Sequence, residues 1–233
     1  MQWEEEPDAG WVATLAGVSE RRARRALAEA QAERRLFHRI AAAHRAGGRP
    51  SYIEIDAPFE LYAITRLRRP RHVLEVGVSS GVSSAYLLQA LERNSYGTLH
   101  SIDLPQFAGR PGRSRRPDTP SWVLPEGQSS GWAVPMSLRG RWDLRLGNKN
   151  VVIPILADDL PRVDLMVYDV PHSDRDAARE FRAIDRRFSP KGVAIADHGP
   201  GGGRCTALQG WAVRRSSSAV RCGELGLYGF RAA

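Results

Sequence analysis

The sequence contains few lysines, few cysteines and no long apolar run, and each of these shortages argues against a particular kind of protein. No apolar run reaches about 18 residues, so we expect no helix that spans a membrane. The N-terminus, Trp3-Glu4-Glu5-Glu6, lacks the basic and then apolar order of a signal peptide, which favours a cytoplasmic protein. Cys205 and Cys222 fit no metal-ligand or redox spacing, so we expect two reduced thiols.

Lysine occurs only at Lys149 and Lys191, so the net charge of +8 is almost entirely due to arginine. The arginines are scattered along the chain, and a GC-rich coding bias explains them as well as a polyanionic partner would. Charge alone therefore does not predict binding of nucleic acid. With 233 residues the chain can bury a full core, and one α/β domain with an N-terminal extension is the expected organisation.

The stretch between residues 71 and 103 reads as a strand, a glycine turn, a helix and a second strand. Residues 73–76 resemble a central parallel strand, and Gly77 and Gly81 let the backbone approach a bound ligand. Asp103 ends the second strand, where a carboxylate can accept hydrogen bonds from both hydroxyls of a ribose. Hydroxyl side chains are expected to cap the helix after the turn: Ser79, Ser80, Ser83 and Ser84. These features predict a nucleoside site.

The spacing of the turn indicates which nucleoside binds. A dinucleotide site uses G-x-G-x-x-G, whereas this turn reads Glu75-x-Gly77-x-x-x-Gly81, and its acid would repel an anion but attract a cation. From about Phe59 to the C-terminus the chain resembles class I S-adenosylmethionine (SAM)-dependent methyltransferases. The resemblance implies an α/β, Rossmann-like fold with a mostly parallel seven-stranded sheet, here with an N-terminal helical extension, and SAM as cofactor. The cofactor-binding residues that it implies are Glu75, Gly77, Ser79, Gly81, Ser83, Asp103, Asn148 and Asp169.

A second group of ionisable residues follows two apolar runs farther along the chain. Asp169 and His172 follow the run that ends at residue 168, and Asp197 and His198 follow the run at 193–196. Parallel strands deliver the residues after their carboxyl ends to one edge of the sheet, where α/β proteins bind ligands. The sequence therefore predicts that these four side chains gather at that edge.

Asp169, Asp197 and His198 resemble the metal ligands of catechol O-methyltransferase and of metal-dependent sugar O-methyltransferases. This resemblance implies a divalent metal, Mg²⁺ or Mn²⁺, but His198 stands where those enzymes have Asp or Asn, so the metal and its presence are open. Asp169 and His172 are the expected catalytic residues. His172 matches a lysine that serves as general base in the catechol enzymes; its alternative roles are a helix cap or a backbone hydrogen bond. Without a metal, His172 or His198 could be the base alone.

The chain is expected to divide into an extension at residues 1–50, which forms a cap or a dimerisation element, and a methyltransferase domain at 51–233. Residues 105–141 are rich in proline and glycine and are expected to form a lid-like insert over cofactor and acceptor. Trp122, Trp132 and Met136 favour the lid over the alternative, a disordered arginine-rich segment. The remaining periodicity predicts helices over 20–46, 59–67, 176–188 and 205–213, with a turn over 189–192, and a helix or turn over 151–160 that Pro154 breaks early. It also predicts strands over 142–146, 164–168 and 193–196 and a closing hairpin over 224–230.

The N-terminal extension allows a second interpretation. Residues 12–19 followed by 21–27 are similar to the helix-turn-helix of bacterial repressors, with Gly17 in the turn and the following helix in a major groove. Two features argue against it: the predicted helix at 20–46 runs on without a break, and Glu4-Glu5-Glu6 adds negative charge upstream. We therefore expect a packing helix, capped by Ser19.

The sequence thus predicts a SAM-dependent O-methyltransferase that acts, with metal assistance, on a hydroxyl of a small natural product or sugar. The alternative is a nucleic-acid-binding or RNA-modifying protein that uses the helix-turn-helix-like element. Asp169-Val170-Pro171-His172 stands where base-methylating enzymes would have an Asn-Pro-Pro-Tyr-like motif, which favours a small-molecule acceptor. We expect neither a nucleic acid nor a membrane as partner, and we leave open whether the chain forms a homo-oligomer.

Overall fold

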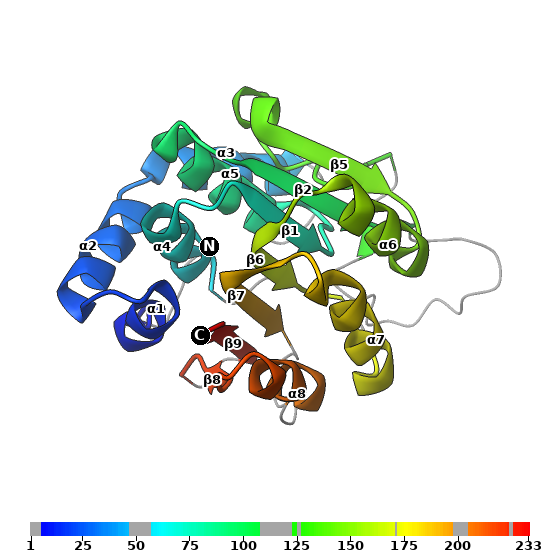
Figure 1. The fold of residues 1–233 in the computed structure, drawn as a ribbon. Helices are drawn as coiled ribbons and strands as arrows, with labels where there is room; N and C mark the ends of the chain where they lie inside the picture. The colour runs from blue at the N-terminus through cyan, green and yellow to red at the C-terminus, as the bar shows by residue number, and fades with distance from the viewer. Residues whose placement is uncertain are drawn as a thin grey trace.

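The computed structural model describes residues 6–46, 57–107, 123–124, 127–170, 172–197, 205–223 and 226–233 (Figure 1). The helices are α1 (Ala9–Ala16), α2 (Glu20–Gln31), α3 (Arg34–Ala46), α4 (Pro58–Arg68), α5 (Val82–Asn94), α6 (Lys149–Asp159), α7 (Asp174–Asp185), α8 (Thr206–Arg214) and the 3₁₀ helix η1 (Met136–Arg141). The strands are β1 (His72–Val76), β2 (Thr98–Asp103), β3 (Gln106–Phe107), β4 (Val123–Leu124), β5 (Trp142–Leu146), β6 (Val163–Tyr168), β7 (Phe188–Asp197), β8 (Val220–Arg221) and β9 (Leu227–Arg231).

Seven strands form one sheet in the order β5-β2-β1-β6-β7-β9-β8. The strands β5, β2, β1, β6 and β7 run parallel to one another, whereas β9 is antiparallel to both β7 and β8. The hairpin of β8 and β9 closes one edge of the sheet and β5 forms the other. This arrangement confirms the predicted Rossmann-like, mostly parallel, seven-stranded fold of class I methyltransferases.

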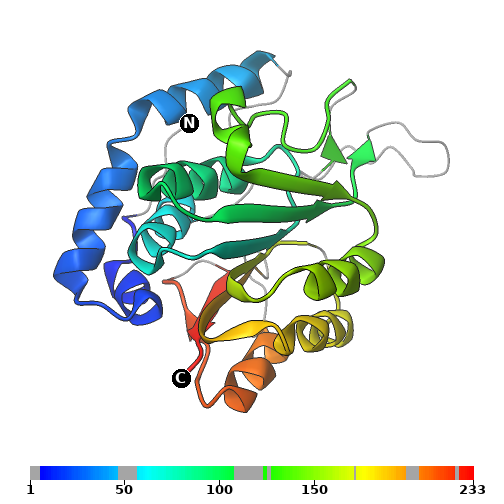
Figure 2. The same cartoon turned by 45° about the horizontal axis from the view of Figure 1, so that its top comes forward.

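Helices cover both faces of the sheet (Figure 2). The N-terminal helices, α4 and α5 pack on one face, and α6, α7 and α8 pack on the other. Strand β1 illustrates this arrangement. Val73 belongs to the core beneath α4 and α5, while Leu74 and Val76 belong to the core beneath α6, α7 and α8. A strand that is covered on both faces needs apolar residues at its odd and its even positions. Residues 73–76 therefore form an almost continuous apolar run.

The predicted helix over 20–46 is wrong, because the chain breaks at Ala32 and Glu33 into α2 and α3. The apolar stripes explain the break. Ala30 ends the buried stripe of α2, and the next buried residue is Leu36, six positions later. Six residues at 100° each place Leu36 about 120° from Ala30 around a continuous helix, so the direction of the buried face changes where α2 ends and α3 begins. The helical spacing of the sequence groups Phe37 with Ala30 and Ile40 on one apolar face, but Phe37 is only half-buried.

Two boundaries in the C-terminal half also differ from the prediction. Helix α6 begins at Lys149 and continues through Pro154, which was expected to break it early. Strand β7 begins at Phe188, where the sequence predicted the end of a helix and a turn over 189–192. Phe188 pairs with Val163 of β6, and the register then shifts before the regular pairing resumes. The strand therefore starts earlier than its apolar run, with an irregularity in place of the expected turn.

The two cysteines lie in different cores. Cys205 belongs to the core beneath α7 and α8, and Cys222 to the core on the other face of the sheet. Neither forms a disulfide, both are buried, and burial raises the pKa of the Cys205 thiol. In the described part of the chain, no helix is both long enough and apolar enough to cross a membrane.

Candidate functional site

The strand registers place four of the predicted site residues in one row at the carboxyl edge of the sheet. Ile102 of β2 pairs with Val76 of β1, Val76 pairs with Tyr168 of β6, and Tyr168 pairs with Ala196 of β7. The residues that follow these four are Asp103, Gly77, Asp169 and Asp197. Adjacent strands lie about 4.8 Å apart, so the row brings three carboxylates to the edge where parallel sheets bind ligands.

Gly77 lies in the middle of this row and leads into the predicted glycine turn. Its φ is 96°, and a Cβ on it would lie 1.8 Å from the carbonyl oxygen of Asp169. Gly81, at the other end of the turn, has φ 91°, and a Cβ there would lie 2.6 Å from Cγ2 of Val134. Ser79 between them also has a positive φ, of 48°. Both glycines are therefore required by their conformation and by close neighbours.

The carboxylate of Glu75 is fully buried beneath the turn. It accepts hydrogen bonds from the hydroxyls of Ser83 and Ser84 at 2.7 Å each and from Ser101 at 2.6 Å. Burial raises the pKa of Glu75, and the three hydroxyl donors partly offset that rise. These bonds tie β1 to α5 and β2, so the described contacts of Glu75 hold the turn in place.

The same bonds correct the predicted helix caps. The hydroxyls of Ser83 and Ser84 were expected to cap the helix after the turn, but both point to Glu75 instead. Helix α5 follows Gly81, which has no side chain to cap it. The predicted cofactor contacts of Glu75 and Ser83 stay predictions, and the contacts of Ser83 described here all lie on the protein side of the turn.

Asp103 is half-buried at the end of β2 and holds the turn from its other side. One carboxylate oxygen accepts a hydrogen bond of 3.3 Å from the backbone N–H of Val78, and the other accepts one from the hydroxyl of Ser130. Ser130 was not predicted as a partner of Asp103, because the two residues are 27 positions apart in the sequence. The carboxylate thus lies against the turn, where the predicted contact with a ribose would be made.

The segment that contains Ser130 packs directly on the glycine turn. The N–H of Gly131 donates to the carbonyl of Ser79 at 2.7 Å, and the N–H of Ala133 donates to the carbonyl of Ser80 at 2.9 Å. These backbone hydrogen bonds hold the segment against the turn. The described C-terminal part of the predicted insert is therefore anchored to the cofactor turn.

The three large apolar residues of the insert have different surroundings. Trp132 is half-buried beside the turn, whereas Met136 is 77% exposed. Trp122 lies outside the described residues. A lid over the acceptor stays a prediction, and Trp132 is the residue of the three that the structure places against the turn.

Asn148 and Lys149 follow β5 at the same edge of the sheet. The side-chain carbonyl oxygen of Asn148 caps α6 by accepting a hydrogen bond of 2.9 Å from the N–H of Asn150. Asn148 is a predicted cofactor contact, for which this oxygen would be the acceptor, and the oxygen already has one partner. A carbonyl oxygen has a second lone pair, so the cap and the predicted contact are compatible.

Lys149 belongs to a polar cluster that the sequence analysis missed. Its ammonium donates to the hydroxyl of Tyr168 at 2.8 Å and lies 2.9 Å from the buried carboxylate of Glu180, to which Tyr168 donates at 2.6 Å. Burial, and then Glu180, raise the pKa of Tyr168. The one available signal was that Lys149 is among only two lysines in the chain. The cluster fixes the end of β6 immediately before Asp169.

His172 is oriented by its own loop. Nδ1 lies 2.7 Å from the carbonyl oxygen of Val170, so this nitrogen carries the hydrogen and Nε2 is left to accept a proton. The imidazole packs edge-on against the ring of Tyr168, with centroids 4.9 Å apart. The expected backbone hydrogen bond is thus confirmed, while the cap of α7 is Ser173. The role of His172 as a base stays a prediction.

Asp197 ends β7 next to the strand that ends before Asp169. His198, the third predicted metal ligand, lies outside the described residues. Within the described ranges, no group of three or more His, Cys, Asp or Glu side chains is arranged to hold a metal. The described residues therefore supply two neighbouring carboxylates, which are hard donors that suit Mg²⁺ or Mn²⁺, and metal binding stays a prediction.

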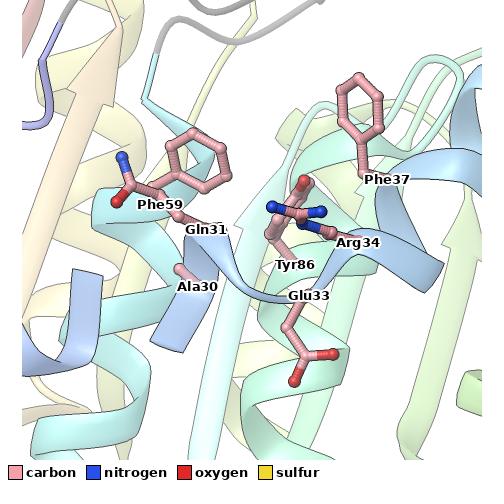
Figure 3. A pocket seen from close by; sticks show the side chains of 7 residues that line it. All are labelled: Ala30, Gln31, Glu33, Arg34, Phe37, Phe59 and Tyr86. Carbon is pink, nitrogen blue, oxygen red and sulfur yellow. The ribbon is translucent and has the colours of Figure 1, made fainter. Parts of the chain in front are cut away.

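A cavity of about 210 Å³ lies where the N-terminal extension meets α4 and α5. Figure 3 shows Phe59 and Gln31 on one side and Phe37 on the other, with Arg34 and Tyr86 between them. Drug-sized ligands occupy roughly 300–1,000 Å³, so this cavity is too small for a nucleoside cofactor. Its lining residues are Ala30, Gln31, Glu33, Arg34, Phe37, Phe59 and Tyr86, and five of these come from the extension.

A family model described as a methyltransferase domain matches residues 74–198, from β1 to the end of β7. This range includes the glycine turn and every residue of the carboxylate row. No curated protein is similar enough in sequence to be matched.

Solved structures with the same fold cover most of the chain. The O-methyltransferase TomG from Streptomyces achromogenes, described as involved in tomaymycin synthesis and solved with SAM, is 19% identical and has a TM-score of 0.54, over 85% of this chain and 89% of its own. An O-methyltransferase from Bacillus cereus, solved with SAH, is 13% identical and has a TM-score of 0.55, over 85% and 90%. Cofactor-bound Rv0187 from MTB is 16% identical and has a TM-score of 0.54, over 98% and 99%. At these identities the likeness concerns the fold.

Proposed function

Because this chain belongs to the methyltransferase domain family and is a SAM-dependent enzyme of class I fold, we propose that it methylates a hydroxyl oxygen of a small natural product or sugar. The observation that carries the proposal is the row of Asp103, Gly77, Asp169 and Asp197 at one edge of the sheet. A turn that binds SAM beside Asp103 would direct the methyl group towards the two later aspartates. The solved O-methyltransferases of the same fold support oxygen as the acceptor atom.

Transfer to a hydroxyl requires in-line orientation of the acceptor and removal of its proton. Asp169 is well placed to orient an acceptor, because its N–H donates to the carbonyl of Val76 at 2.8 Å and fixes it beside the turn. His172 follows on the same loop with Nε2 as its proton acceptor. We assign Asp169 to orientation of the acceptor and His172 to removal of the hydroxyl proton.

We also propose that Asp169 and Asp197, together with His198, hold a divalent cation, with Mg²⁺ or Mn²⁺ as the expected ions. Neighbouring carboxylates after parallel strands support this proposal, since carboxylate oxygens are hard donors that suit these ions. A cation held there would lower the pKa of an acceptor hydroxyl. The check is turnover after exhaustive chelation, followed by add-back of single metals; full turnover in chelator by metal-free protein would refute the cation.

The test of the main proposal is product detection by mass spectrometry with labelled SAM and a panel of catechols, glycosides and transfer RNA. We expect label on a hydroxyl oxygen of a small molecule. The matched control is Asp103→Asn, which should lose cofactor affinity while the protein stays folded. Label that appears only on transfer RNA, or only on nitrogen or carbon, would refute the proposal.

A further inference from the structure

Helices α1 and α2 are joined by a three-residue turn at Gly17, Val18 and Ser19. Gly17 has φ 68° and ψ 44°, and its N–H donates to the carbonyl of Ala13 at 2.9 Å. The N–H of Val18 donates to the same carbonyl at 3.1 Å, which closes the end of α1. The chain thus makes a short helix, a left-handed glycine turn and a longer helix, which is the order of elements in a helix-turn-helix.

The two helices belong to the core that covers one face of the sheet, where they pack with α4. Val12 and Leu15 of α1 and Ala23 and Leu27 of α2 are at most 4% exposed, and they share one cluster with Leu61 of α4. The pair is therefore a rigid unit that leaves one face of α2 towards solvent. Helix α2 lies at the periphery of the molecule in both views of the fold (Figures 1 and 2).

The outward face of α2 is basic. Arg21, Arg22, Arg24 and Arg25 are all exposed, and Arg24 alone has an acidic partner, Glu20 at 3.3 Å. The other three arginines make no hydrogen bond or ion pair within the part of the chain that the structure describes. Both residues of the Arg24–Glu20 pair are at least 60% exposed, so the pair does little to neutralise the face.

A fifth arginine extends the positive charge to the turn. The guanidinium of Arg231, at the end of β9, lies over Gly17, where a Cβ would be 2.1 Å from Nη1. One acidic side chain lies near the start of α2: a Cβ on Gly10 would be 3.4 Å from Oδ1 of Asp8 and 3.9 Å from Oε1 of Glu20. The described arginines of the face, four on α2 and Arg231 on β9, outnumber these two carboxylates.

We propose that α1 and α2 form a helix-turn-helix that binds double-stranded DNA, with the N-terminal half of α2 in the major groove. The sequence argument against such an element was an unbroken helix over 20–46, and the structure removes it by ending α2 at Gln31. A helix is about 10–12 Å across and the major groove about 12 Å wide, so α2 fits the groove with its arginines facing phosphates and base edges. This binding is independent of the methyl acceptor.

The test is fluorescence anisotropy of a labelled random-sequence 25-base-pair duplex at several salt concentrations. We expect a micromolar Kd near 0.1 M salt, as is usual for non-specific binding. Replacement of all four arginines (R21A/R22A/R24A/R25A) should weaken binding at least tenfold. It should also reduce the slope of log K against log salt by about 3 to 4, since each lost phosphate contact removes about 0.9.

The matched control replaces four exposed arginines at the other side of the sheet: Arg175, Arg179, Arg182 and Arg186. These lie on or next to α7, a helix as long as α2, and their loss changes the net charge equally. The control should keep its DNA affinity within twofold. Thermal unfolding checks both proteins, and the single variants R22A and R25A replace the fourfold variant if it does not fold, each with a slope change of about 1.

Three outcomes would overturn the proposal. The first is wild-type protein that shows no salt-dependent binding to the duplex. The second is an equal loss of affinity in the α7 control, which would show that net charge alone accounts for the binding. The third is tighter binding to transfer RNA that is lost with the same four arginines, because that would make the basic face an RNA surface.

Discussion

Gly77 and Asp169 are packed so closely that the carbonyl oxygen of Asp169 occupies the place of a side chain on Gly77. The contact follows from the sheet, since Val76 and Tyr168 pair and the next residues of both strands must leave the edge together. The N–H of Asp169 also donates to the carbonyl of Val76. The cofactor turn and the loop that carries Asp169 and His172 are therefore one unit, in which a change at the turn reaches the proposed catalytic residues.

We expect Gly77→Ala to abolish detectable SAM binding and to lower the free energy of unfolding by more than about 2 kcal/mol. The reason is twofold: a positive φ costs an alanine about 1–2 kcal/mol, and the new methyl group would collide with backbone, which cannot move aside as a flexible side chain can. Calorimetric SAM titration and denaturant unfolding measure both effects. Gly140→Ala is the matched control, because its Cβ would meet nothing within 4 Å; equal behaviour of the two variants would contradict the account.

We expect Asp103→Asn to weaken SAM binding about tenfold or more, because the loss of one charged acceptor costs about 1–3 kcal/mol. Asparagine keeps one oxygen for the N–H of Val78, so the turn can stay closed while the second acceptor is lost. Ser130→Ala removes only the protein partner of that second oxygen and should change affinity less. Isothermal titration calorimetry compares the three proteins. Unchanged affinity in folded Asp103→Asn would remove the ribose contact.

The sequence sufficed for those parts of the fold and site that depend on local pattern. Almost continuous apolar runs predicted strands that are buried on both faces, and therefore a parallel sheet. Because parallel strands end at the same edge, the same pattern predicted that Asp103, Asp169 and Asp197 lie at one edge of the sheet. The glycine turn was equally local, since a positive φ and a close backbone neighbour both demand glycine at Gly77.

Two missed hydrogen-bond partners, Ser130 and Ser101, are distant in sequence from the carboxylates that they contact. Ser130 meets Asp103 from 27 residues away, and Ser101, which donates to Glu75, also accepts a hydrogen bond of 2.8 Å from the indole of Trp142. No periodicity announces such pairs. The break at Ala32 and Glu33 was missed for another reason: both halves have helical periodicity, and only the phase of the buried residues differs.

A pH effect on stability is expected from His72, which lies at the opposite end of the sheet from the carboxylate row. Burial, and then the neighbouring His100, lower the pKa of His72 below its ordinary value. The unfolded chain, with a histidine pKa of about 6.5, therefore binds a proton more readily than the folded chain does. The contribution of His72 is complete above that value and is lost as pH falls from about 6.5 through the lowered pKa.

Unfolding by denaturant at pH 7.5 and pH 5.5 measures this contribution. We expect His72→Gln to reduce the loss of unfolding free energy between the two pH values, because the variant has no proton to gain on unfolding. His38→Gln, at an exposed position on α3, is the control and should keep the pH dependence of the wild type. An undiminished loss in His72→Gln would show that other groups cause the acid sensitivity.

The role of His172 can be separated from its structural contact. If Nε2 removes the hydroxyl proton, His172→Ala should lower turnover by about 10² or more with little change in SAM affinity, and the acidic limb of the pH profile should disappear. Alanine also deletes the hydrogen bond to the carbonyl of Val170, so this variant alone does not distinguish a base from a loop anchor.

His172→Asn supplies the distinction, because the amide nitrogen of asparagine can take the place of Nδ1 and donate to Val170 while no group remains at Nε2 to accept a proton. We expect this variant to be as slow as His172→Ala and equally free of the acidic limb, with SAM affinity close to that of the wild type. Turnover near the wild-type rate in His172→Asn would mean that the hydrogen bond is the whole contribution of His172. The proton of the acceptor would then leave by another route, and His198 and bulk solvent would be the next groups to examine.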